Sequence, residues 1–126
     1  MVSQIVAVAS GGAIGSTARF LLGGAVLRLS GYALFPYSTL AVNALGCFAI
    51  GLITGYIEKH HVFHGDMRLF LITGILGGFT TFSAFGFETV ALLRQGNTAA
   101  AVFNVVASIA LGLGAVWLGL KFHGAV

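Results

Sequence analysis

The stretch MRLFLITGILGGFTTFSAFGFETVALL, residues 67–93, is apolar and longer than a membrane span requires. A helix of about 20 apolar residues crosses a hydrocarbon core about 30 Å thick, so this stretch predicts a transmembrane segment. Its middle, however, holds the adjacent glycines Gly77 and Gly78, followed closely by Thr80 and Thr81. These residues are poor helix formers, so we expect the helix to break there.

A break at this depth would make residues 74–85 a candidate site. Freed backbone groups survive inside a membrane only against protein or a water-filled cavity, and such breaks commonly coordinate ions. The alternative is a continuous helix, in which the glycines mark a tight crossing and the hydroxyls bond to preceding carbonyls.

Three further apolar windows of suitable length flank this one, at residues 5–27, 38–57 and 99–120. Polar or turn-forming breaks separate the windows, at residues 30–37, 58–66 and 94–98. Together the windows use nearly the whole chain. We therefore predict an all-α membrane protein with a single four-helix transmembrane domain, residues 1–126, and a broken third helix.

The composition excludes several classes of function. Charged residues make up 7% of the chain and hydrophobic residues 58%, whereas an ordinary soluble domain has roughly 25% charged residues. The only carboxylates are Glu58, Asp66 and Glu88, so acid–base catalysis has almost no residues to use, and we expect no enzyme. Cys47 is the single cysteine, which excludes an intramolecular disulfide. The scattered Lys and Arg residues argue against nucleic acid as a partner.

The basic residues near the helix ends give almost no preferred orientation. With four helices, Lys59, Arg68 and Lys121 lie on one side of the membrane, and Arg28 and Arg94 lie on the other. This near balance favours insertion in both orientations, which makes an antiparallel homodimer possible. A weakly biased single orientation is the alternative.

Many of the 19 glycines lie inside the windows rather than between them. Several form small-xxx-small pairs, which let helix backbones approach closely where no hydrophobic driving force exists. We expect packing to be the main role of these pairs, which are Gly11 with Gly15, Gly51 with Gly55, Gly74 with Gly78, and Ser108 with Gly112.

Phe82 and Phe85 lie three residues apart, so they face nearly the same direction on a helix that follows the break. Packing against lipid is the default role for phenylalanine in a membrane. The alternative uses the positive edge of the ring, which can meet a partly dehydrated anion without trapping it.

Asn43 lies inside the second window, where its amide must find a hydrogen-bond partner. It could link two helices, or it could donate to an anion in a pore without carrying a charge. Asn104 and Ser108 raise the same choice on the fourth window, and Thr39 could be a simple helix cap.

The charged residues at membrane depth also allow two interpretations. Arg19 could extend to the interface, or it could raise the anion potential of a vestibule. Glu88 is a functional candidate, or it pairs with a nearby Arg. His60, His61 and His64 have a spacing that permits metal binding, although a loop of titrating histidines is the simpler interpretation.

Four segments, taken together, resemble the Fluc/CrcB family of fluoride channels in their usual order. They cover all four windows: GGAIGSTARF at 11–20, TLAVNALGCFAIG at 39–51, GGFTTFSAF at 77–85 and NVVASIALG at 104–112. The third segment is the most specific, and a chance match of all four at the correct spacing is improbable.

The resemblance implies a channel of the bacterial inner membrane that passively exports fluoride and confers fluoride resistance. It also implies a dual-topology antiparallel homodimer with two fluoride pores, each using groups from both subunits. A structural sodium ion is expected at the dimer centre, held by the backbone carbonyls of Gly77 and Thr80. The partners would thus be fluoride, a second copy of the chain and membrane lipid.

The resemblance also assigns roles to individual side chains. Phe82 and Phe85 would line the pore, Asn43 would donate to fluoride, and Arg19 would be the basic residue of the vestibule. The remaining polar lining would come from Ser83, Thr39 and Ser108, with Glu88 near the end of the pore. Two departures thin this polar lining: the family more often has threonine at the position of Ala84, and Gly112 offers no hydroxyl.

Two other functions compete with this hypothesis. Small proton-coupled multidrug-type transporters also have about four helices, but they require a carboxylate early in the chain, and the first window has none. A noncatalytic assembly subunit would need neither a broken helix nor an amide at membrane depth.

Overall fold

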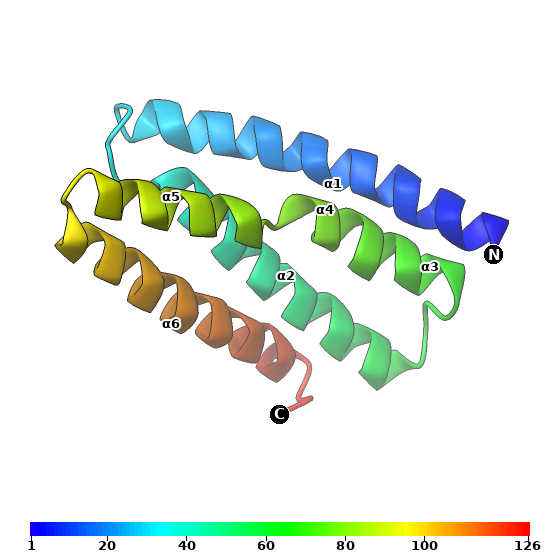
Figure 1. The fold of residues 1–126 in the computed structure, drawn as a ribbon. Helices are drawn as coiled ribbons and strands as arrows, with labels where there is room; N and C mark the ends of the chain where they lie inside the picture. Colours follow the sequence, from blue (N-terminus) through cyan, green and yellow to red (C-terminus); the bar gives the residue numbers. More distant parts are fainter.

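The computed structural model describes all residues, Met1–Val126, and is entirely helical (Figure 1). Four helical segments are long and apolar enough to cross a membrane, which confirms the prediction of an all-α protein with four such segments. Three are single helices: α1 (Val2–Leu29), α2 (Tyr37–His60) and α6 (Thr98–Phe122). Each extends the predicted window by one to three residues at either end.

The third membrane segment, Asp66–Arg94, is built from four pieces. In chain order these are α3 (Asp66–Arg68), the π-helix η1 (Leu69–Leu76), α4 (Gly77–Phe79) and α5 (Phe82–Arg94). Between α4 and α5 the backbone is extended, with φ −86° and ψ 157° at Thr80 and φ −150° and ψ 112° at Thr81. The π-helix was not anticipated from the sequence, because it changes the hydrogen-bond register and not the apolar pattern.

Glycines allow α1 to pack directly on η1 and α4 (Figure 1). A Cβ atom on Gly11 would lie 2.5 Å from the Phe70 carbonyl oxygen and 2.9 Å from the Gly74 Cα. A Cβ atom on Gly15 would overlap the Ile75 carbonyl group. The predicted packing role of these glycines is therefore confirmed, and it fixes the first half of the third segment against α1.

A second glycine contact joins α2 to α6. A Cβ atom on Gly51 would overlap the Val116 carbonyl oxygen, and one on Gly119 would lie 2.5 Å from the Phe48 carbonyl oxygen. The helices are thus grouped as α1 with the first half of the third segment and α2 with α6 (Figure 1).

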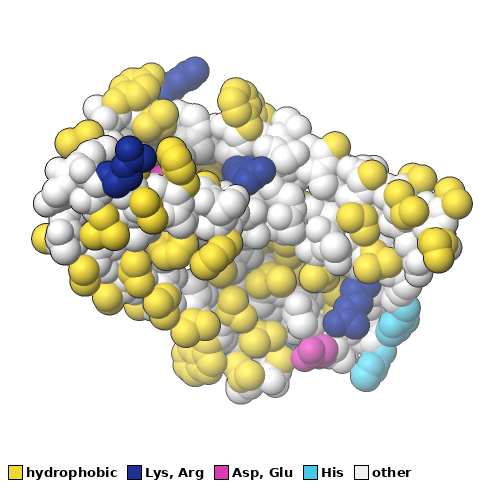
Figure 2. Space-filling model, in the orientation of Figure 1, with side chains coloured by type: hydrophobic (Ala, Val, Ile, Leu, Met, Phe, Trp, Pro, Cys, Tyr) yellow, Lys and Arg dark blue, Asp and Glu magenta, His cyan; other side chains and the backbone are white.

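Little of the chain is buried in the isolated structure. Hydrophobic side chains cover much of the face seen in Figure 2, whereas charged side chains are few. The histidines visible on this face gather at the end of the molecule where α2 joins α3. A water-exposed surface of this kind would aggregate, so the distribution fits a protein whose helices face lipid or a second protein surface.

Candidate functional site

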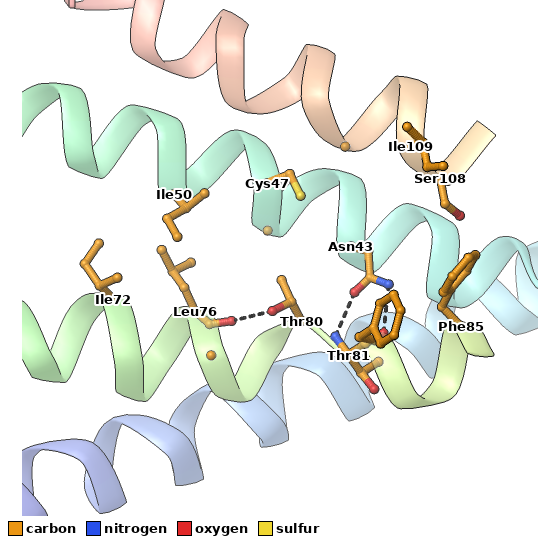
Figure 3. A pocket seen from close by; sticks show the side chains of 14 residues that line it. Asn43, Cys47, Ile50, Ile72, Leu76, Thr80, Thr81, Phe85, Ser108 and Ile109 are labelled. Carbon is orange, nitrogen blue, oxygen red and sulfur yellow. Dashed lines mark hydrogen bonds between the residues drawn. The ribbon is translucent and has the colours of Figure 1, made fainter. Parts of the chain in front are cut away.

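A pocket of about 380 Å³ lies where the break in the third segment faces α2 and α6 (Figure 3). Its wall is largely apolar, with the aromatic rings of α5 and aliphatic side chains beside a few neutral polar groups, and it has no charged side chain. Six of the predicted site residues line it: Asn43, Gly77, Thr80, Phe82, Phe85 and Ser108. The tertiary structure thus gathers residues from three different membrane segments around the break.

Asn43 joins α2 to the break through both ends of its side-chain amide. Its Nδ2 donates to the Thr81 carbonyl oxygen at 3.0 Å, and its Oδ1 accepts from the Thr81 N–H at 2.8 Å (Figure 3). Asn43 therefore links two membrane segments, which is one of the two roles considered for it from the sequence. Because an NH₂ group carries two hydrogens, one N–H remains for a further partner.

The break leaves backbone carbonyls free inside the membrane segment. In a continuous α-helix the Gly77 carbonyl would accept from the N–H of Thr81. Here the Thr80 N–H donates to Leu76 at 3.0 Å, and the Thr81 N–H donates to Asn43. The Thr80 carbonyl also accepts no hydrogen bond from the chain. Free carbonyl oxygens are ligands suited to a hard cation, so Gly77 and Thr80 fit the predicted sodium site.

Thr81 also caps the helix that follows the break. Its Oγ1 accepts from the Ala84 N–H at 3.2 Å and lies 3.2 Å from the Ser83 Oγ. Such a cap satisfies one of the free donors at a helix start. Ser83 is thereby turned toward Thr81 and does not line the pocket of this subunit.

The rings of Phe82 and Phe85 form a tilted pair with centroids 5.5 Å apart. Phe85 is partly covered, but Phe82 is 83% exposed in the single subunit. A ring this exposed next to a pocket is placed to contact another molecule, either lipid or a second copy of the chain.

Glu88 and Thr39 lie beyond the pocket, on α5 and α2. The Thr39 hydroxyl donates to Glu88 Oε1 at 2.6 Å, and Oε2 is buried without a partner. The partner of Glu88 is therefore a hydroxyl group and not an arginine. Thr39 links two helices and is not a helix cap, because the N-cap of α2 is Pro36.

The sequence over residues 6–120 matches the family described as CrcB-like protein, Camphor Resistance (CrcB). This chain belongs to the CrcB family. The resemblance drawn from the four motifs is confirmed.

Curated relatives cover almost the whole of this CrcB chain. A protein of Methylobacillus flagellatus named "Fluoride-specific ion channel FluC" is 51% identical over 118 residues, which are 94% of this chain and 92% of that protein. Proteins with the same name from Rhizobium etli and Geobacter sulfurreducens are 46% and 48% identical. These alignments cover 98% of both chains for the first and 94% of both chains for the second.

Other predicted residues of this CrcB chain lie apart from the pocket. Arg19 is partly exposed on α1, and neither it nor Glu88 lines the pocket. His60 stacks on Tyr56 with ring centroids 4.4 Å apart, and His64 Nε2 lies 2.7 Å from the His61 carbonyl oxygen. No group of three or more His, Cys, Asp or Glu residues is placed to hold a metal ion.

Sequence reasoning assigned no role in the site to Cys47 or Thr89 and no partner to Thr81 in this CrcB chain. Cys47 lines the pocket, although from the sequence it was considered only for disulfide formation. Thr81 supplies the backbone groups that Asn43 binds, and Thr89 accepts a hydrogen bond from Asn104 at 2.9 Å. The polar residues opposite the break could have indicated such partners, because an extended segment inside a membrane needs donors and acceptors from other helices.

Proposed function

We propose that this chain is a fluoride-selective channel that exports fluoride passively and thereby confers fluoride resistance. The observation that carries the proposal is the name shared by relatives about half identical over nearly the whole chain, which are called fluoride-specific ion channels. The same names give no support to a proton-coupled multidrug-type transporter. Membership of a channel family also agrees with a protein that is not an enzyme.

The chemistry of the pocket supports an anion of this kind. A small, strongly hydrated anion loses its water only where several donors replace it, and a fixed positive charge at that point would hold it too tightly. The pocket offers neutral groups: the remaining amide N–H of Asn43, the hydroxyl of Ser108, and the ring edges of Phe82 and Phe85. These groups could pass fluoride without trapping it.

We further propose that two copies assemble as an antiparallel, dual-topology homodimer in the bacterial inner membrane. Support comes from the near balance of basic residues at the two ends and from the exposure of Phe82 beside the pocket. In this assembly each of two pores would use groups from both subunits. Arg19 would lie in the vestibule, and Ser83, Thr39 and Glu88 would extend the polar lining beyond the pocket.

Gly77 and Thr80 would hold a sodium ion at the dimer centre through their free carbonyls. A cation there supplies positive potential and satisfies backbone groups that the break leaves without partners. We expect the reconstituted dimer to melt at a lower temperature when sodium is replaced by N-methylglucamine. An unchanged melting temperature in metal-free buffer would count against the site.

Fluoride efflux from liposomes tests the proposed function directly. Vesicles with purified protein and internal potassium fluoride are expected to release fluoride rapidly once valinomycin supplies a compensating potassium current, with little release of chloride from matched vesicles. A fluoride electrode measures the efflux. Efflux that does not depend on valinomycin but requires a proton gradient would indicate coupled transport. Absence of flux from folded dimer would refute the channel function.

Phe82→Ala is expected to slow fluoride efflux by about fivefold, because a ring contact is worth roughly 1 kcal/mol and each 1.4 kcal/mol changes a rate tenfold. The variant should still fold, since Phe82 is 83% exposed in the subunit. Phe87→Ala is the matched control: Phe87 is 76% exposed on the same helix and does not line the pocket. Equal rates for the two variants would remove Phe82 from the pore.

A further inference from the structure

The helix that carries both phenylalanines is not held in place by the helix before it. The extended residues Thr80 and Thr81 separate α5 from α4, so helix continuity does not fix the direction in which Phe82 and Phe85 point. Contacts with neighbouring helices must do so.

Three polar links between helices hold α5 and the residue preceding it. Two come from α2: the Asn43 amide bonds the backbone of Thr81, and the Thr39 hydroxyl donates to Glu88. The third is the only polar link from α6, in which Asn104 Nδ2 donates to Thr89 Oγ1 at 2.9 Å.

The link from α6 is the most enclosed of the three. Asn104 is 2% exposed and is the one fully buried polar residue of the subunit. It does not line the pocket, whereas Ser108, one turn later on α6, does. The Asn104 side chain is thus directed at α5 and not at the pocket.

Thr89 also bonds to the helix turn that bears Phe85. Its hydroxyl accepts from Asn104 and donates to the Phe85 carbonyl oxygen at 2.8 Å. A threonine that bonds to the carbonyl four residues earlier bends its helix, and the bond exists only in certain side-chain rotamers. The Asn104 side chain is thus linked, through Thr89, to the helix turn that bears Phe85, whose ring lines the pocket (Figure 3).

We propose that Asn104 and Thr89 are positioning residues that set the rate at which each pore conducts. They do so by fixing the orientation of Phe85 and make no contact with the anion. The inference rests on the proposed fluoride channel function.

The test measures the fluoride rate of single channels, at no more than one channel per vesicle, separately from the fraction of active vesicles. Asn104→Leu removes the donor but keeps the number and branching of the side-chain heavy atoms, and we expect a rate about threefold lower, since such interhelical bonds average about 0.6 kcal/mol. Asn97→Ala is the control, because Asn97 caps the start of the same helix and makes no bond to α5. It should conduct at the wild-type rate.

Thr89→Val and Thr89→Ser provide a second pair that is independent of how Asn104→Leu folds. The valine variant loses the hydroxyl and should slow the single-channel rate, whereas the serine variant keeps the hydroxyl and should not. The double variant Asn104→Leu with Thr89→Val should be no slower than the slower single variant, because both remove one linkage.

Four outcomes would overturn the proposal or the function on which it rests. A lower fraction of active vesicles at an unchanged single-channel rate would assign the pair to folding alone. Losses that multiply in the double variant would show that the two residues act independently. Wild-type vesicles that release no fluoride would refute the channel function itself. If the wild type conducts and the variants conduct at the same rate, only the positioning role is refuted.

Discussion

Asn43→Ala is expected to lower the fluoride efflux of the reconstituted channel by about 30-fold, because it removes two hydrogen bonds of roughly 1 kcal/mol each and a candidate donor to the anion. Both bonds go to the backbone of Thr81, at 3.0 and 2.8 Å. Without Asn43 the N–H and C=O of Thr81 have no partner at membrane depth, where an unpaired polar group costs several kcal/mol. The break should therefore lose its defined geometry.

Ser38→Ala separates this effect from the loss of any interhelical bond. Ser38 also lies on α2 and donates across helices, to the Gly23 carbonyl at 3.0 Å, but it is not part of the pocket. We expect its efflux to stay near the wild-type rate. If Asn43→Ala conducts as fast as Ser38→Ala, Asn43 neither holds the break nor meets the ion. Size-exclusion chromatography of both variants must first show folded protein.

Gly15→Ala is expected to prevent stable folding or to lower the melting temperature strongly. A Cβ atom at Gly15 would overlap the Ile75 carbonyl and would lie 2.9 Å from the Phe79 nitrogen. Both are backbone atoms, which cannot move aside as a side-chain end can. Overpacking of this kind typically costs 1–3 kcal/mol even in cores that can adjust. The same contact lies directly before the break, so any protein that folds should also conduct poorly.

Gly24→Ala is the control on the same helix, because a Cβ atom at Gly24 would meet nothing within 4 Å. Chromatography after heating in detergent gives the melting temperature of each variant. Because both variants replace one glycine by alanine on the same helix, a difference between them reports the packing contact. We expect Gly24→Ala to match or exceed the wild-type melting temperature, since alanine favours helix more than glycine does. Equal melting temperatures for the two variants would contradict the close packing of α1 on the third segment.

The membrane segments could be predicted from the sequence because they depend on local composition alone. Any window such as residues 99–120 partitions into hydrocarbon by its own side chains, and the structure places α6 at Thr98–Phe122. The packing role of Gly11 and Gly74 was also indicated by the spacing of small residues, which let helix backbones approach closely. Which glycines would meet could not be predicted, because that depends on how the helices pair.

Candidate site residues could be predicted in type but not in partnership. Asn43, Thr39 and Asn104 were each conspicuous as polar groups in apolar windows. Their partners are Thr81, Glu88 and Thr89, which lie 38, 49 and 15 residues away in the chain. No local pattern encodes such pairs, so the choice between linking helices and lining a pore stayed open until the helices were placed.

The sequence by itself determined that this is a four-helix membrane protein with neutral polar residues at membrane depth, and its motifs determined the family. Both follow from side-chain chemistry and order along the chain, which require no knowledge of contacts. Only the tertiary structure decided that Asn43 holds the break at Thr81 and that Asn104 reaches α5. The physical reason is that hydrogen-bond partners on different helices are chosen by the rotation and depth of each helix, and these are fixed by the packing of the whole bundle.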